Sequence, residues 1–165
     1  MPDSPIRRAA REVEAHVATD GWDQRPRLFA LVLTSDLIAA EPGLAVQLAD
    51  EPGAFTPIEQ ELTGDRDLED LLTDIVWPDT VAGCAAVVER IMLPPEAEDS
   101  LPDDPDELLE VVAHHPDRRE VRLVAAVIRD GQTHSAVRAR DADAELLEGP
   151  DLVPGLIEHL RRTLA

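Results

Sequence analysis

The chain is organised around one stretch, Trp77-Pro78-Asp79-Thr80-Val81-Ala82-Gly83-Cys84-Ala85-Ala86-Val87-Val88-Glu89-Arg90-Ile91-Met92-Leu93. Its second half, residues 84–93, is a nearly continuous apolar run between a glycine and two prolines, which is typical of a strand covered on both faces. Pro78 predicts the end of any helix before it, because proline lacks the amide donor and disfavours helical backbone at the preceding residue. We therefore expect a central strand at 84–93, with Trp77 packed at the junction that precedes it.

The sequence before this strand alternates helical and extended patterns. Apolar residues at helical spacing predict a first helix from Ser4, which would cap it, to Gly21. A short apolar strand follows at 28–33, and 34–36 would cap a short helix that ends near residue 42. The segment 44–55 fits either a helical turn or a loop. The run Thr56-Pro57-Ile58-Glu59 matches a capping box and predicts a helical turn, and 68–75 predicts another amphipathic helix.

Beyond the central strand, Asp104-Pro105-Asp106-Glu107 predicts a helix start, and His114-His115-Pro116 predicts its end. The apolar segments 120–128 and 133–140 flank Asp130-Gly131, which predicts a hairpin. A two-residue turn there would place Leu123 opposite Arg138, and a last helix covers 151–164. We therefore expect a single domain over residues 1–165, of the α+β class. It would have a mainly antiparallel sheet of about four strands, ending in the C-terminal hairpin and packed against the N- and C-terminal helices.

Composition limits the partners of the protein. The formal net charge of −20 creates a negative field that repels nucleic-acid backbones and anionic membranes. Aromatic residues make up only 2% of the chain, which leaves few rings for stacking on bases. We therefore expect no nucleic-acid and no membrane partner. The chain also has no lysine, asparagine or tyrosine, which is consistent with a high-GC genome, and adaptation to high salt is an alternative origin of the acidity.

The single cysteine, Cys84, allows no intramolecular disulfide, and no apolar run approaches the length of a membrane span. The N-terminus also lacks a basic segment leading into an apolar one, so we expect a cytoplasmic protein. Cys84 stands beside Gly83 and Ala85 at the start of an apolar strand, an environment that favours a buried thiol over a nucleophile.

Patterns that carry catalysis or metal binding are weak in this sequence. The nucleophile elbow, the phosphate-binding loop and the dinucleotide-binding glycine pattern are all missing. His114 and His115 are adjacent, so on a helix their side chains would diverge by about 100° and would not face one metal ion. The acidic run 103–107 lacks the alternating oxygen ligands of a calcium loop and is explained by a helix cap. We therefore expect no cofactor, and we favour a non-enzymatic protein, although missing motifs do not exclude an enzyme.

Two groups of residues are the candidate sites. Glu89 and Arg90 interrupt the central strand, and because neighbours in a strand point to opposite faces, each needs its own partner. Structural pairing is the simpler interpretation, and a polar ligand site is the alternative. The second group is one predicted face of the hairpin, where apolar and basic side chains would mix as in contact surfaces; it consists of Leu123, Val127, Arg129, His134, Arg138 and Arg140.

Several motifs also carry a resemblance to a known family. They include Trp77-Pro78-Asp79-Thr80, together with the segments 56–61, 81–85, 88–91, 93–95, 115–122 and 149–156. Through them the chain resembles a family of small acidic actinobacterial proteins to which no activity is assigned, so the resemblance carries over no catalytic residue. The order of elements is also loosely similar to the fold of type III secretion chaperones, which are acidic dimers that bind partner proteins.

The sequence therefore favours a protein-binding module, chaperone-like or adaptor-like, whose partner is another protein or a second copy in a homodimer. The alternative is a small-molecule binding protein or an enzyme, with a polar site near Glu89, Arg90 and the hairpin arginines.

Overall fold

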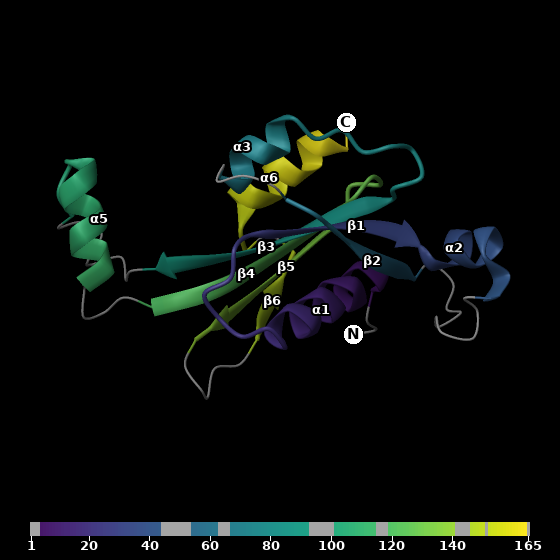
Figure 1. Ribbon diagram of the computed structural model, residues 1–165, viewed down its shortest axis with the longest axis horizontal. Helices are drawn as coiled ribbons and strands as arrows, with labels where there is room; N and C mark the ends of the chain where they lie inside the picture. Colours follow the sequence, from purple (N-terminus) through teal and green to yellow (C-terminus); the bar gives the residue numbers. More distant parts are fainter. Residues whose placement is uncertain are drawn as a thin grey trace.

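The computed structural model describes residues 4–43, 54–62, 67–92, 101–114, 119–140, 146–150 and 152–164. These residues form five helices and a six-stranded antiparallel sheet (Figure 1). The elements follow in the order α1 (Pro5–Ala18), β1 (Arg27–Leu33), α2 (Thr34–Ala40), β2 (Phe55–Gln60), α3 (Leu68–Thr73), β3 (Gly83–Met92), α5 (Pro105–His114), β4 (Arg119–Ile128), β5 (Thr133–Ala139), β6 (Leu147–Gly149) and α6 (Pro154–Thr163). The α+β class is confirmed, whereas the expected number of about four strands was too low.

The strand predicted at 84–93 is β3, and its central place is confirmed. The strands lie in the order β2-β1-β3-β4-β5-β6, so β3 pairs with β1 on one side and β4 on the other. Cys84, Ala85 and Ala86 are fully buried between the two faces. The predictions for 44–53, for Leu93 and for His115-Pro116 lie outside the described residues.

Helices cover both faces of the sheet, and each face has its own apolar core. Helix α1 lies across one face, and α3 and α6 lie side by side on the other (Figure 1). Ser4 caps α1 as predicted, accepting a hydrogen bond from the amide of Arg7 at 3.2 Å. The core under α1 contains Ile6, Ala9, Ala10, Val13, Val17, Phe29, Leu31, Ala85, Val87, Val124, Ala126, Ile128 and Ala136. The core under α3 and α6 contains Leu28, Leu68, Leu72, Cys84, Ala86, Val88, Ala125, Val127, Leu156, Ile157, Leu160 and Leu164.

The helical turn predicted at Thr56-Pro57-Ile58-Glu59 was wrong, because this run lies in β2. It pairs antiparallel with β1, with Leu31 opposite Pro57 and Phe29 opposite Glu59. A proline is tolerated there because β2 is an edge strand, whose outward amides need no partner. The capping-box pattern is thus overridden by pairing with β1. The helix α2 begins at Thr34 without a side-chain cap.

The hairpin exists, but its predicted register was wrong by one residue. The loop has three residues, Arg129 to Gly131, because the Ile128 amide donates to the Gln132 carbonyl at 3.0 Å. Gly131 takes the left-handed conformation, with φ of 100°. Leu123 therefore lies opposite Val137 and not opposite Arg138. Since side chains alternate between faces, this slip moves the β5 side chains to the opposite face from the one predicted.

Helix α5 stands apart from the two layers. Figure 1 shows it beyond the ends of β3 and β4, away from both faces of the sheet. Neither core contains a residue of α5 among the described side chains. In the described part of the chain, no helix combines the length and apolar character that crossing a membrane requires.

Candidate functional site

The polar pair of the central strand is divided between the two faces of the sheet. Glu89 accepts hydrogen bonds from the amides of Asp23 at 2.9 Å and Gln24 at 3.1 Å. Arg90 donates to Glu69 of α3 at 2.6 Å on the other face. The structure therefore does not bring Glu89 and Arg90 together, and each has the separate partner that the structural interpretation requires.

Arg122 completes the environment of Glu89, and sequence reasoning missed it. Its side chain is only 1% exposed, and its terminal nitrogen lies 3.8 Å from the Glu89 carboxylate. The guanidinium stacks 4.4 Å above the Trp22 ring and donates to the Gly21 carbonyl. Its Nε has no hydrogen-bond partner among the described residues. Together, Glu89 and Arg122 hold the turn after α1 against the sheet.

This turn needs such an anchor because its backbone is unusual. Asp23 has a φ of 66°, a left-handed conformation that few residues other than glycine adopt without cost. Its carboxylate also accepts two hydrogen bonds of 3.0 Å from Arg140. These bonds and the charge of Arg140 lower the pKa of Asp23, so the carboxylate stays ionised. No local pattern in the sequence indicates this contact, because Asp23 and Arg140 lie far apart in the chain.

The residues predicted to form one hairpin surface are divided between the two faces of the sheet and the end of the hairpin. Leu123 and Val127 face the core under α3 and α6, where Val127 is buried. Arg138 lies on the opposite face, where it forms an ion pair with the buried carboxylate of Glu14 on α1. His134 is on that same face, and Arg140 contacts Asp23 and Glu120. The register error explains why apolar and basic side chains were assigned to one face.

His134 belongs to a cluster around Glu148 of β6. The Glu148 carboxylate accepts hydrogen bonds from Arg11 at 2.9 and 2.8 Å and from Arg7 at 3.2 Å, and His134 Nε2 lies 3.2 Å away. The bonds from Arg11 and then Arg7 lower the pKa of Glu148 to about 2, although partial burial opposes the shift. A carboxylate held ionised in this way is a poor general acid or base near neutral pH. The cluster fastens α1 to the β6 edge of the sheet.

Arg129 has a structural position at the end of the hairpin. Its guanidinium donates to the carbonyls of Val81 at 2.7 Å, Pro78 at 3.0 Å and Trp77 at 3.1 Å. It also donates to the carbonyl of Leu164 at the end of α6, at 2.8 Å. The prediction that Trp77 is packed is confirmed, since its half-buried ring lies against the second core. Arg129 and Trp77 therefore join the segment before β3 to the C-terminal helix.

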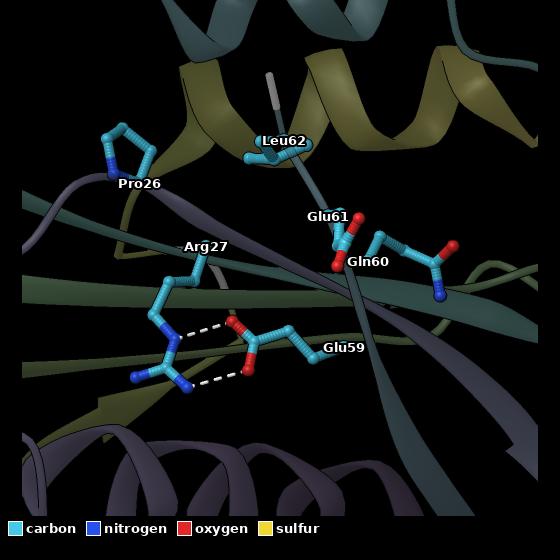
Figure 2. A pocket seen from close by; sticks show the side chains of 6 residues that line it. All are labelled: Pro26, Arg27, Glu59, Gln60, Glu61 and Leu62. Carbon is cyan, nitrogen blue, oxygen red and sulfur yellow. Dashed lines mark hydrogen bonds and ion pairs between the residues drawn. The ribbon is translucent and has the colours of Figure 1, made fainter. Parts of the chain in front are cut away.

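A shallow hollow lies where β2 meets the start of β1. Figure 2 shows its lining: Pro26, Arg27, Glu59, Gln60, Glu61 and Leu62. Arg27 and Glu59 form a two-bonded ion pair at 2.7 Å, and the remaining Arg27 nitrogen donates to Asp20 and Gln24. The bonds from Arg27 lower the pKa of Glu59, so this carboxylate also stays ionised. Because Arg27 and Glu59 are paired with each other, we assign this pair a structural role.

Cys84 is the one cysteine of the chain and the candidate nucleophile considered above. Cys84 is fully buried, and burial raises the pKa of its thiol to about 11 against weaker effects of Thr163 and Trp77. This is an unreactive thiol, as the sequence predicted. In the described residues, no three histidine, cysteine or acidic side chains are grouped closely enough to hold a metal ion.

The described side chains of α5 form an unusual surface. Val111 is 40% exposed and Leu108 is half-buried, although both belong to the apolar side of the helix. Glu107, Glu110 and His114 are exposed beside them, and with Pro102 and Val111 they line a hollow. The packing of the described residues therefore does not account for the exposed apolar side chain of Val111 on this helix.

Comparison with known proteins identifies the family and goes no further. No curated protein and no solved structure matches the chain. The family model described as PPA1309-like protein matches residues 6–165, which is nearly the whole sequence. The match names no activity, substrate or partner. The chain therefore belongs to the PPA1309-like protein family.

Proposed function

We propose that this protein is a non-enzymatic, cytoplasmic protein-binding module, of the adaptor or chaperone-like kind, that presents α5 to a partner protein. The observation that carries the proposal is the position of α5 away from both cores (Figure 1). An amphipathic helix is stable mainly when its apolar side is packed, and an isolated helix of ten residues is marginal in water. A partner groove would pack against the exposed Val111 side chain of this helix.

The charges of α5 favour a basic partner. Asp106, Glu107 and Glu110 lie with His114 within an arc of about 100° around the helix axis. All three carboxylates are exposed, and the net charge of the chain is −20. A groove with an apolar floor and a rim of lysine or arginine would match both sides of this helix. The same field would also attract such a partner from a distance.

The alternative of a small-molecule site has weaker support. It placed a ligand near Glu89, Arg90 and the hairpin arginines, and these side chains point to different faces and bind other groups of the chain. In the hollow beside β2, the Arg27 guanidinium is already occupied by Glu59 and Asp20. We therefore put the protein-binding function first.

The test is an affinity pull-down from native lysate with the wild type and with Val111→Glu. The substitution places a charge on the exposed apolar side of α5, so partners that bind α5 should be lost. Val76→Glu is a matched control, because Val76 is 80% exposed in the segment between α3 and β3. Circular dichroism and urea unfolding should show that both variants remain folded.

The pull-down has a decisive counterpart for the small-molecule alternative. A thermal-shift screen against metabolites is run on the same wild-type protein. A partner retained by Val76→Glu and lost by Val111→Glu supports the proposed function. A clear stabiliser at millimolar concentration or below, together with no enriched protein, would reverse the ranking in favour of a small-molecule site.

A further inference from the structure

We propose that the β6 edge of the sheet accepts an extended, apolar and basic segment of a partner protein as a seventh strand. This surface is separate from α5, so the inference does not depend on the function proposed above. It is carried by a row of four side chains that lie directly opposite one another on β3, β4, β5 and β6, here called the edge row: Val88, Leu123, Val137 and Leu147.

Exposure increases along the edge row towards β6. Val88 is buried, Leu123 and Val137 are half-buried, and Leu147 is 63% exposed. The cause is the position of α6, which packs on β3 and β4 and covers the centre of the sheet better than its β6 edge. Single exposed apolar side chains are common on protein surfaces. Leu147 differs because it continues a row of apolar side chains, and contiguous apolar surface is typical of interaction sites.

Leu152 extends the edge row along the border of the sheet. It is 44% exposed, and its side chain lies over Gly149. The Leu152 Cδ2 atom is 3.2 Å from the position that a Cβ atom on Gly149 would take. Because residues of a strand alternate between faces, Gly149 lies on the same face of β6 as Leu147, and Glu148 between them lies on the opposite face. A strand added beside β6 would therefore meet Leu147 and Leu152 with its own alternate side chains.

The other face of the same edge is closed. Glu148 points towards α1, where Arg7 and Arg11 bind its carboxylate. Leu146 packs against the core beneath α1. The edge is thus covered on one face by α1 and remains apolar on the other, so an added strand would gain burial mainly on the α3 and α6 face.

Hydrogen bonds hold this edge in place before any partner arrives. The Ser135 hydroxyl donates to the Gly149 carbonyl at 2.8 Å and accepts from the Leu152 amide at 2.8 Å. The Thr133 hydroxyl donates to the Pro150 carbonyl at 2.7 Å. An edge that is already fixed loses little conformational entropy when a strand binds, which favours affinity.

The two edges of the sheet differ in a way that selects β6. The β2 edge contains Pro57, which has no amide proton to donate to an added strand. Strand β6 itself contains no proline, with Pro150 following it directly, and it is the last strand in the order of the described sheet. Strand addition through main-chain hydrogen bonds, with alternate side chains providing specificity, therefore suits β6.

Charge and size identify the occupant as a basic partner segment and not a second copy. Two copies that each carry a net charge of −20 repel one another, whereas a segment with arginine or lysine is attracted. A stable protein dimer usually buries more than about 1,000 Å² in total, which a few side chains at the end of a row do not provide. An extended segment with alternating apolar and basic residues satisfies both conditions.

The test is fluorescence anisotropy with a labelled synthetic peptide in which valine and arginine alternate over eight residues. A second peptide of the same composition carries the four valines first and the four arginines last, so that its charge is equal and its pattern is not. The full chain should bind the alternating peptide at least tenfold more tightly than the second peptide. The Leu147→Thr variant, which changes no charge and keeps a residue suited to strands, should lose that preference. Ile58→Thr at the β2 edge is the matched control, because Ile58 is 40% exposed on the opposite edge strand.

Each result decides the question. Equal binding of the two peptides, or an unchanged preference in Leu147→Thr, would show that the attraction is only electrostatic and would overturn the proposal. Light scattering gives the competing outcome: a wild type that is dimeric at tens of micromolar, with a monomeric Leu147→Thr, would assign the edge to a second copy. The Val111→Glu pull-down tests α5 alone, and the peptide and light-scattering experiments test the β6 edge alone. Each proposal can therefore be refuted without affecting the other.

Discussion

Truncation of Trp77 tests how the segment before the central strand is joined to the C-terminal helix. The ring is half-buried against the core under α3 and α6, and its Nε1 donates to the Thr163 hydroxyl at 2.8 Å. Replacing a fully buried tryptophan by alanine costs about 3 to 5 kcal/mol, so half-burial predicts about 2 kcal/mol. The lost hydrogen bond adds about 1 kcal/mol. We expect Trp77→Ala to lower the free energy of unfolding by about 3 kcal/mol in total.

Two companion variants separate these contributions. Trp77→Phe keeps most of the ring and removes the donor, so it should cost about 1 kcal/mol. The Thr163 hydroxyl is not left unsatisfied, because it still donates to the Leu160 carbonyl at 2.5 Å. Val76→Ala is the neighbouring control, and it should change stability by less than about 0.5 kcal/mol because Val76 is 80% exposed.

The assay is urea unfolding followed by far-ultraviolet circular dichroism, because the substitution removes one of the two tryptophans and alters the fluorescence signal. A loss below about 1 kcal/mol in Trp77→Ala would refute the packing argument and show that the ring contributes little to the fold. Equal losses in Trp77→Ala and Trp77→Phe would instead assign the whole effect to the hydrogen bond.

Three further predictions concern other parts of the structure. Because the pKa of Glu148 is about 2 in the fold against an ordinary value of 4.5, its stabilisation is complete above about pH 4.5 and is lost as the pH falls towards 2. The difference in unfolding free energy between wild type and Glu148→Gln should therefore shrink over that range of a urea titration at stepped pH, and a constant difference would contradict the assignment. Gly83→Ala should cost about 2 to 3 kcal/mol in urea unfolding, since the new Cβ would lie 2.4 Å from the Val127 carbonyl oxygen; an unchanged midpoint would show that β3 and β4 separate easily. The Cys84 thiol, with a pKa of about 11 and no exposure, should react with an aromatic disulfide reagent at neutral pH only as fast as the protein opens, and rapid labelling of the native state would contradict its burial.

The sequence was most informative where one short signal fixes one element. Ser4-Pro5 marks the start of α1, and the apolar run after Gly83 marks the central strand, because caps and doubly buried strands depend on nearby residues. The hairpin was also visible from Asp130-Gly131. Its register was not, because two-residue and three-residue loops share that dipeptide and differ in where the left-handed glycine lies.

Elements that depend on distant partners could not be predicted in this way. β2 resembles a helix start locally and becomes a strand only through its pairing with β1. β6 has three residues and no periodicity to detect, and its place follows from pairing with β5. Arg122 and Glu89 meet the turn after α1 across long separations in sequence, so spacing gives no sign of that contact. The missed strands include β6, whose edge is the proposed binding surface.

The packing of α1 has a consequence for how the chain folds during synthesis. The helix leaves the ribosome well before β4 and β5, yet these two strands cover much of its apolar side, including Ile6 and Val13. Chain elongation at about 5 to 20 residues per second leaves this helix without its partners for several seconds. Folding must also wait for these long-range contacts, which slows it relative to proteins with local contacts. Until β4 and β5 have been synthesised, the apolar side of α1 is therefore open to chaperones and to aggregation.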